Sequence, residues 1–232
     1  MSGSDTLLLG LVWYAIFLFS VTVHEAAHAW AAGRGGDATA AGQVTLDPLP
    51  HIRQEPFGTV VVPLISYWAG GWMIGWASTP FDPAWAERHP RRSALMALAG
   101  PAANLMLVLA AGAAIKAGQS AGVFFPPDRI LPSQVAATNL PGMWVGAAEG
   151  VSVVFTLNLV LFAFNLIPVP PLDGSTIVTL ALPARAAAWY RARIRHPAVA
   201  ILGLLCAWAL FGTVFSGIHR LAIHALYPGA YR

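Results

Sequence analysis

Residues 7–32 read LLLGLVWYAIFLFSVTVHEAAHAWAA, and this stretch decides the fold. A helix needs about 20 consecutive apolar residues to cross the hydrocarbon core of a bilayer, and this stretch is long enough. No basic segment precedes it and charged residues lie within it, so we interpret it as a retained transmembrane helix rather than a cleaved signal peptide. The sequence therefore predicts a membrane protein whose first helix carries polar chemistry.

The polar chemistry is the motif His24-Glu25-Ala26-Ala27-His28. Residues four apart share a helix face, so both imidazoles can point at one metal ion with Glu25 beside it. Zinc in such a site lowers the pKa of a water molecule to near 7, and the glutamate takes and later delivers the proton. A charged residue in mid-membrane costs about 2.5 to 3.5 kcal/mol, which favours a functional role. The alternative is a metal-free set of interhelical hydrogen bonds.

The composition agrees with a bilayer as solvent. Of the 232 residues, 57% are hydrophobic and 10% are charged, against about a quarter charged in soluble domains. The mean hydropathy is +0.63. The formal net charge of +3 bears on orientation in the membrane, and no basic stripe indicates a nucleic-acid partner.

The apolar stretches predict an all-α polytopic membrane protein, a bundle of about four to six transmembrane helices forming a single domain over residues 1–232. The four clear spans are Leu7 to Ala32, Ser93 to Ala117, Val151 to Pro168, and Pro197 to Ile218. The Trp-rich stretch Phe57 to Ala77 is interrupted by Pro and Gly, and we expect it to re-enter the membrane rather than cross it. Residues Leu172 to Leu182 are expected to continue the third span after a proline break.

Two arginine clusters orient the spans, because positively charged loops remain in the cytoplasm. The clusters are Arg88, Arg91 and Arg92, and Arg185, Arg191, Arg193 and Arg195. Placing both in the cytoplasm makes residues 33–91 a cytoplasmic-side hairpin or re-entrant region and residues 118–146 an external loop. Gly42 to Leu46 reads as a short strand, so a small strand or re-entrant element is expected between the first and second spans. An edge around Val60 to Leu64 could present an extended substrate.

A catalytic zinc site needs three protein ligands and one open position, and Asp173 is the best candidate for the third ligand. It follows the run Asn165-Leu-Ile-Pro-Val-Pro-Pro-Leu172 and is flanked by apolar sequence. Consecutive prolines force an extended segment, which is tolerated at membrane depth only beside protein or a water-filled cavity. The remaining acids fall in polar connections or on the external side, and five histidines are expected to be interfacial rather than ligating: His51, His89, His196, His219 and His224.

With these motifs in order, the chain resembles the site-2 proteases, the zinc intramembrane metalloproteases, in their compact branch without an inserted PDZ domain. The resemblance rests on His24 to His28, on Ala99-Gly-Pro-Ala-Ala-Asn104-Leu105 and on Asn165 to Gly174. It implies one zinc ion per chain held by His24, His28 and Asp173, with Glu25 as the base. It also implies that Asn104 and Asn165 face the site, where an amide could hold the substrate or stabilise an oxyanion; interhelical hydrogen bonding is the alternative for both.

The expected function is hydrolysis of peptide bonds in or near transmembrane segments of client proteins, in the bacterial inner membrane with the site toward the cytoplasm. The expected partners are the lipid bilayer, a transmembrane substrate and a regulatory membrane protein. Two rival functions remain open at this point: a catalytically silent membrane scaffold, and a metal transporter that uses the same ligands. The intact Glu25 disfavours the scaffold, and the concentration of intramembrane acids and histidines at one place disfavours the transporter.

Overall fold

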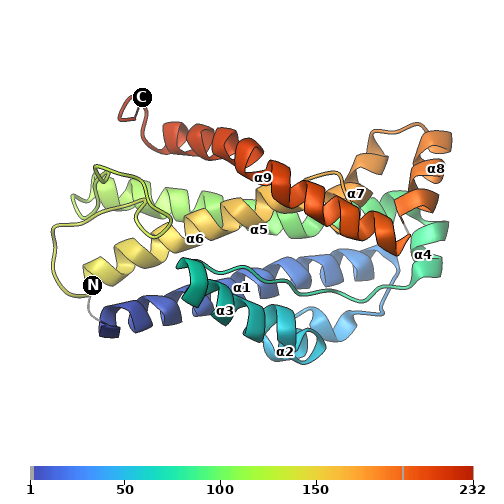
Figure 1. The fold of residues 1–232 in the computed structure, drawn as a ribbon, viewed down its shortest axis with the longest axis horizontal. Helices are drawn as coiled ribbons and strands as arrows, with labels where there is room; N and C mark the ends of the chain where they lie inside the picture. Colours follow the sequence, from blue (N-terminus) through green and yellow to red (C-terminus); the bar gives the residue numbers. More distant parts are fainter. Residues whose placement is uncertain (1–2, 195, 232) are drawn as a thin grey trace.

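A computed structural model describes residues 3–194 and 196–231, and four long helices dominate it (Figure 1). They are α1 (Gly3–Gly35), α5 (Pro90–Ser120), α6 (Met143–Asn165) and α9 (Pro197–Leu226). Among the described residues, these four are long and apolar enough to cross a membrane. Their directions alternate along the bundle, as Figure 1 shows. The four predicted spans are therefore confirmed, and the lower end of the predicted range of four to six helices is correct.

Helices α1, α5 and α6 form the inner part of the bundle, and α9 packs mainly against α6. One apolar core joins Trp13 and Phe17 of α1 to Val153 and Leu157 of α6. In the most apolar part of α9, only 11% is buried within the protein. Side chains there such as Ile201 and Leu205 are exposed. Because those side chains are apolar, the outer face of α9 suits contact with lipid tails. An exception is Gly203, whose added Cβ would lie 2.3 Å from the Pro170 carbonyl oxygen, so α9 meets that backbone closely.

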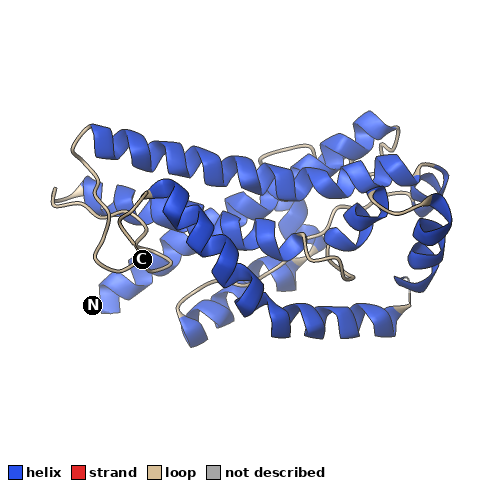
Figure 2. Ribbon diagram, turned by 90° about the horizontal axis from the view of Figure 1, so that it is seen from above, coloured by secondary structure: helices blue, strands red, loops and turns tan. Residues whose placement is uncertain are grey.

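The connection between α1 and α5 is helical and extended, not a sheet (Figure 2). It contains η1 (Ala41–Gln43), α2 (Leu49–Gln54), η2 (Phe57–Val61), α3 (Val62–Gly70) and α4 (Pro83–Arg88). The expected small strand is not formed in this connection, and the structure does not support the re-entrant element. Between Thr45 and Leu49, side chains occupy the backbone donors: Asp47 N donates to Thr45 Oγ1 at 3.0 Å and Leu49 N donates to Asp47 Oδ1 at 2.9 Å. Such local bonds compete with strand pairing.

The predicted edge around Val60 to Leu64, expected to pair with an extended substrate, is also wrong. These residues lie in η2 and α3, where the backbone is helical. The extended chain comes after α3 instead. There, Ile74 N donates to Ser66 Oγ at 2.9 Å and Trp76 N donates to Gly58 O at 3.1 Å, so residues 72–82 pass back beside the helices that precede them.

The chain after α6 turns sharply. Residues Leu172 to Leu182 do not continue the third span, because α6 ends at Asn165 and only α7 (Gly174–Ile177) and η3 (Val178–Leu180) follow before α8 (Ala184–Ile194). A Cβ added to Gly174 would lie 2.3 Å from Ile167 O and 2.4 Å from Leu166 O. The chain thus folds back onto the end of α6 at a position where only glycine fits, and Asp173 lies in that turn.

The segment between α5 and α6, expected as an external loop of uncertain order, packs onto the bundle. Ser152 Oγ of α6 accepts hydrogen bonds from Val135 N and Ala136 N, both at 2.9 Å, and Phe125 and Ala137 form an isolated bridge. Val135 and Ala136 are also part of an apolar core with α5, α6 and α9. The segment is held in place by hydrogen bonds from its backbone N–H groups to the buried Ser152 hydroxyl. The composition of the loop does not predict these bonds.

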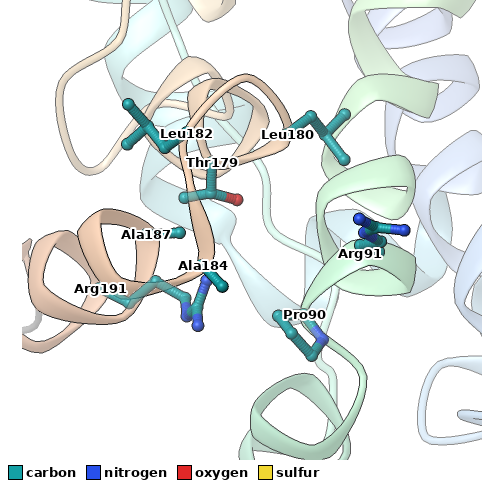
Figure 3. Close-up of a pocket in the computed structure, with 8 residues that line it drawn as sticks. All are labelled: Pro90, Arg91, Thr179, Leu180, Leu182, Ala184, Ala187 and Arg191. Atoms are coloured by element: carbon teal, nitrogen blue, oxygen red, sulfur yellow. The ribbon is translucent and has the colours of Figure 1, made fainter.

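At the opposite end of the bundle, α5, η3 and α8 enclose a pocket of about 140 Å³ (Figure 3). Arg91 of α5 and Arg191 of α8 both line it. One arginine from each cluster is therefore found at the same end of the bundle, which agrees with the sequence-based assignment of both clusters to the same side of the membrane. The full lining is Pro90, Arg91, Thr179, Leu180, Leu182, Ala184, Ala187 and Arg191, so this pocket is separate from the histidine motif.

Candidate metal centre

The two imidazoles of α1 are fixed by hydrogen bonds at their Nδ1 atoms. His24 Nδ1 lies 2.5 Å from Asn104 Oδ1, and His28 Nδ1 lies 2.7 Å from the Met96 carbonyl oxygen, both on α5. Because each partner is an oxygen acceptor, each Nδ1 donates, which leaves the Nε2 lone pair of a neutral imidazole free to bind a metal ion. Both side chains are 6% exposed. Outer-shell hydrogen bonds of this kind orient histidines that bind metals.

The two Nε2 atoms meet Asp173 to form a compact set of acceptors. They lie 3.0 Å from each other, and Asp173 Oδ2 lies 3.2 Å from that of His24 and 3.3 Å from that of His28. In the neutral form of both imidazoles, these three atoms present lone pairs to one another, an arrangement that a cation between them stabilises. Tetrahedral zinc with ligands at about 2.0–2.1 Å places its ligands about 3.3 Å apart. The residues present therefore fit a zinc ion.

Gly100 of α5 provides the room that this arrangement needs. A Cβ added there would lie 2.4 Å from His28 Nε2 and 2.5 Å from His24 Nε2. Any side chain at position 100 would therefore occupy the space in front of the imidazoles. In the sequence, Gly100 stands out only as part of the segment Ala99 to Leu105; the structure adds a direct steric relation to the histidines.

Glu25 lies beside this set and is held by Thr79. The Thr79 hydroxyl is 2.7 Å from Glu25 Oε2 and 3.0 Å from the Glu25 carbonyl oxygen. A carboxylate oxygen of Glu25 and one nitrogen from each of the two histidines lie within 4.8 Å of one another, so Glu25 could itself contribute to a metal site. Asp173 Oδ2 also offers a ligand atom, 3.2 and 3.3 Å from the two Nε2 atoms, whereas Glu25 Oε2 accepts a hydrogen bond from Thr79.

Buried amides surround the centre on the side of α6. Asn104 is fully buried, and its Nδ2 donates to Asn158 Oδ1 at 2.8 Å. Asn158, also fully buried, donates to Ser20 Oγ at 2.9 Å. The hydrogen bonds thus run from α6 through Asn104 to His24. Sequence reasoning missed Asn158, Ser20 and Thr79; an amide in the apolar run of α6 was the available signal for Asn158.

Asn165 makes no hydrogen bond to the other candidate residues among those that the structure describes. Its Nδ2 donates to Leu161 O at 3.1 Å within α6, and no other hydrogen bond of Asn165 is found among the described residues. Of the six residues singled out from the sequence, the structure therefore gathers five, namely His24, Glu25, His28, Asn104 and Asp173. His51, expected to be interfacial rather than ligating, has a fully buried side chain.

Four apolar helices surround two buried imidazoles, the buried Glu25 carboxylate and the partly exposed Asp173 carboxylate, which together define a membrane protein with the chemistry of a metallohydrolase. A family model described as "Peptidase family M50" matches residues 12–209. The chain belongs to this family, the site-2 protease family, and is an integral membrane zinc metalloprotease.

Individual relatives agree with the family. The chain is 32% identical over 180 residues to "Putative zinc metalloprotease YwhC" of Bacillus subtilis, which covers 75% of this chain and 72% of the relative. It is 29% identical over 160 residues to "Putative zinc metalloprotease Rip2" of Mycobacterium tuberculosis, which covers 68% of this chain and 52% of the relative. The match thus spans about half the length of Rip2. No solved structure gives a significant match.

Proposed function

We propose that this metalloprotease hydrolyses peptide bonds in or beside transmembrane segments of client membrane proteins, using one zinc ion per chain held by His24, His28 and Asp173. The observation that carries the proposal is the set of three acceptor atoms, 3.0 to 3.3 Å apart, inside a bundle of membrane-spanning helices. Zinc, when bound, supplies Lewis-acid polarisation of a carbonyl group and lowers the pKa of a water molecule.

The chain's own residues account for the proton transfers. Glu25 Oε2 accepts the Thr79 hydrogen bond, so Oε1 is left to take a proton from the attacking water and deliver it to the leaving nitrogen. Asn104 holds the imidazole of His24 through Nδ1. Its role in this proposal is orientation of His24, because both of its amide atoms are already bonded to the protein. Asn165, assigned to the site by the family resemblance, bonds to Leu161 O through Nδ2, and its Oδ1 is available to a substrate.

The substrate backbone must be extended at the point of attack, because a helix hides its carbonyl groups in hydrogen bonds. The buried site and the apolar exterior support a substrate that arrives from the membrane rather than from water. The rival functions make different use of the same residues. A transporter needs successive polar sites along a path, whereas His24, Glu25 and His28 are the one His/Cys/Asp/Glu group of this kind among the described residues.

Purified wild type and Glu25→Gln in proteoliposomes test the proposal. We expect both to contain one zinc ion per chain by elemental analysis, and cleavage of a tagged transmembrane substrate to fall by about 10²–10⁴-fold in the variant. A wild-type protein that binds zinc without cleaving any transmembrane substrate would indicate a scaffold. Zinc accumulation inside the vesicles without cleavage would indicate a transporter.

We further propose that the centre lies toward the cytoplasmic face of a bacterial inner membrane. Arg34 follows His28 by six positions on α1, about 9 Å along a helix, and the arginine-lined end of the bundle is on that side. In a Cys206→Ala background, a cysteine replacing Arg191 should react with a membrane-impermeant thiol reagent only after cell lysis. Labelling in intact cells whose outer membrane has been permeabilised would reverse the orientation.

A further inference from the structure

Thr79 makes a contact that the sequence motifs do not explain. It lies in the extended chain between α3 and α4, 54 positions away from Glu25, yet its hydroxyl reaches both the Glu25 carboxylate at 2.7 Å and the Glu25 carbonyl oxygen at 3.0 Å. Glu25 is 6% exposed, so water competes little for its oxygens. A hydrogen bond to a charged acceptor in such surroundings is stronger than one between neutral groups.

The position of Thr79 is fixed by its neighbour Ser78. The Ser78 hydroxyl donates to Glu55 Oε1 at 2.8 Å and accepts from Gln54 Nε2 at 3.2 Å. Successive side chains of an extended chain point to opposite sides, so Ser78 faces the end of α2 while Thr79 faces α1. The segment is therefore a bridge between α2 and the helix that carries the metal-binding histidines.

The same segment is held closely to η2. Trp76 N donates to Gly58 O at 3.1 Å, and a Cβ added to Gly75 would lie 2.3 Å from Gly58 O. A backbone approach this close leaves the segment little freedom to slide along η2. Thr79 is thereby presented to Glu25 by a rigid support, which is the requirement for accurate orientation of a reactive group.

We propose that Thr79 is the positioning residue of the general base: it holds Glu25 Oε2 so that Oε1 points at the water molecule. This inference rests on the proposed proteolytic function and adds a residue to it. A hydroxyl has one proton and donates to one acceptor at a time. It holds the carboxylate while Glu25 is charged and can turn to the Glu25 carbonyl oxygen once Glu25 has taken the proton from water, which frees the carboxyl group to deliver that proton to the leaving nitrogen.

The decisive variants are Thr79→Val, which keeps the shape of the side chain without the hydroxyl, and Thr79→Ser, which keeps the hydroxyl. For cleavage of a transmembrane substrate, we expect Thr79→Val to lower kcat by about 10–100-fold, part of the 10²–10⁴-fold typical of a general base. KM and zinc content should change by less than about twofold, and Thr79→Ser should stay within about threefold of wild type. Thr138→Val is the matched control, because Thr138 Oγ1 donates to the Val123 carbonyl oxygen far from the centre.

A double variant separates positioning from a general structural effect. Residues that act as a unit are not additive, so Glu25→Gln with Thr79→Val should cleave no more slowly than Glu25→Gln alone. Multiplicative losses, wild-type kcat in Thr79→Val, or loss of zinc in that variant would each overturn the inference. Inactivity of the wild type would overturn the proposed function and this inference together, whereas an active wild type with an equally active Thr79→Val would overturn the inference alone.

Discussion

His24 Nδ1 lies 2.5 Å from Asn104 Oδ1, although 80 positions separate the two residues in the chain. The contact joins α1 to α5 at the metal centre and fixes which nitrogen of His24 is free to bind. Loss of an outer-shell partner lowers metal affinity or activity by about 10–100-fold. We expect Asn104→Leu to weaken zinc binding by that factor in a chelator competition, while Asn104→Asp, which keeps an acceptor oxygen, stays closer to wild type. Unchanged zinc affinity in Asn104→Leu would contradict this assignment.

Substitutions of the two carboxylates near the imidazoles should have opposite effects on zinc retention. Asp173 Oδ2 lies within 3.3 Å of both Nε2 atoms, whereas Glu25 Oε2 accepts a hydrogen bond from Thr79. We expect Asp173→Ala to lose zinc during dialysis against a mild chelator, with an affinity loss greater than the 10–100-fold or so of an outer-shell change. Glu25→Gln should retain its zinc under the same dialysis. The reverse pattern would make Glu25 the third ligand.

Gly100 gives a steric test within a single helix. Alanine at position 100 would place its Cβ 2.4 to 2.5 Å from the two Nε2 atoms, so Gly100→Ala should displace the imidazoles and abolish zinc binding. Gly112→Ala, also in α5, places its Cβ at an ordinary 3.7 Å from Phe155 and is the control. Because alanine favours a helix over glycine by about 0.5–1 kcal/mol, the control should be as stable as wild type or more so. Full zinc content in Gly100→Ala would show that the space between position 100 and the imidazoles can hold a methyl group.

His51 predicts a dependence of stability on pH. Burial lowers the pKa of His51 below its ordinary value of 6.5, and the negative charges of Glu25 and Asp47 oppose that shift only in part. Below pH 6.5 the unfolded chain therefore binds more protons at this position than the folded chain, so His51 makes folding less favourable as the pH falls from 6.5 toward the folded-state pKa. Neither ring nitrogen has a hydrogen-bond partner among the described residues.

Replacement of His51 by leucine should remove this acid sensitivity. We expect the fall in Tm between pH 7.5 and pH 5.5, followed by tryptophan fluorescence, to be smaller in His51→Leu than in wild type. The exposed His224 provides the control, and His224→Ala should behave as wild type. An equal fall in Tm for wild type and His51→Leu would show that His51 finds a partner or is accessible to protons in the folded protein.

The sequence alone predicted the residues of the centre that lie on a regular helix or directly after a run of prolines. His24 and His28 share a face because they are four positions apart in a helix, and the prolines before Asp173 indicated a turn at membrane depth. Asn158 and Asn165 show where such reasoning stops. They are seven positions apart and so share a face of α6, but that spacing separates them by about 10 Å along the axis. Helical periodicity indicated the face and left the depth undetermined.

The region between the first two spans was harder to predict because its structure depends on contacts between distant residues. No sequence motif surrounds Thr79. It lies beside Glu25 because the neighbouring Ser78 is hydrogen-bonded to Gln54 and Glu55. The strand expected over Gly42 to Leu46 is replaced at its start by the turn η1, in which Gln43 N donates to Ala40 O and Val44 N to Ala41 O. Burial of His51 likewise depends on how α2 is placed against its surroundings, which its flanking prolines do not specify.

The tight fit of Gly203 against the Pro170 carbonyl oxygen places α9 directly against the turn that carries Asp173. The outward face of α9 is exposed, and Pro170 precedes Asp173 by only three positions. A tilt of α9 toward the bundle cannot be absorbed by a compressible side chain at this contact, since a glycine meets backbone there. Changes in bilayer thickness that tilt α9 would consequently push on the very turn that aims the carboxylate.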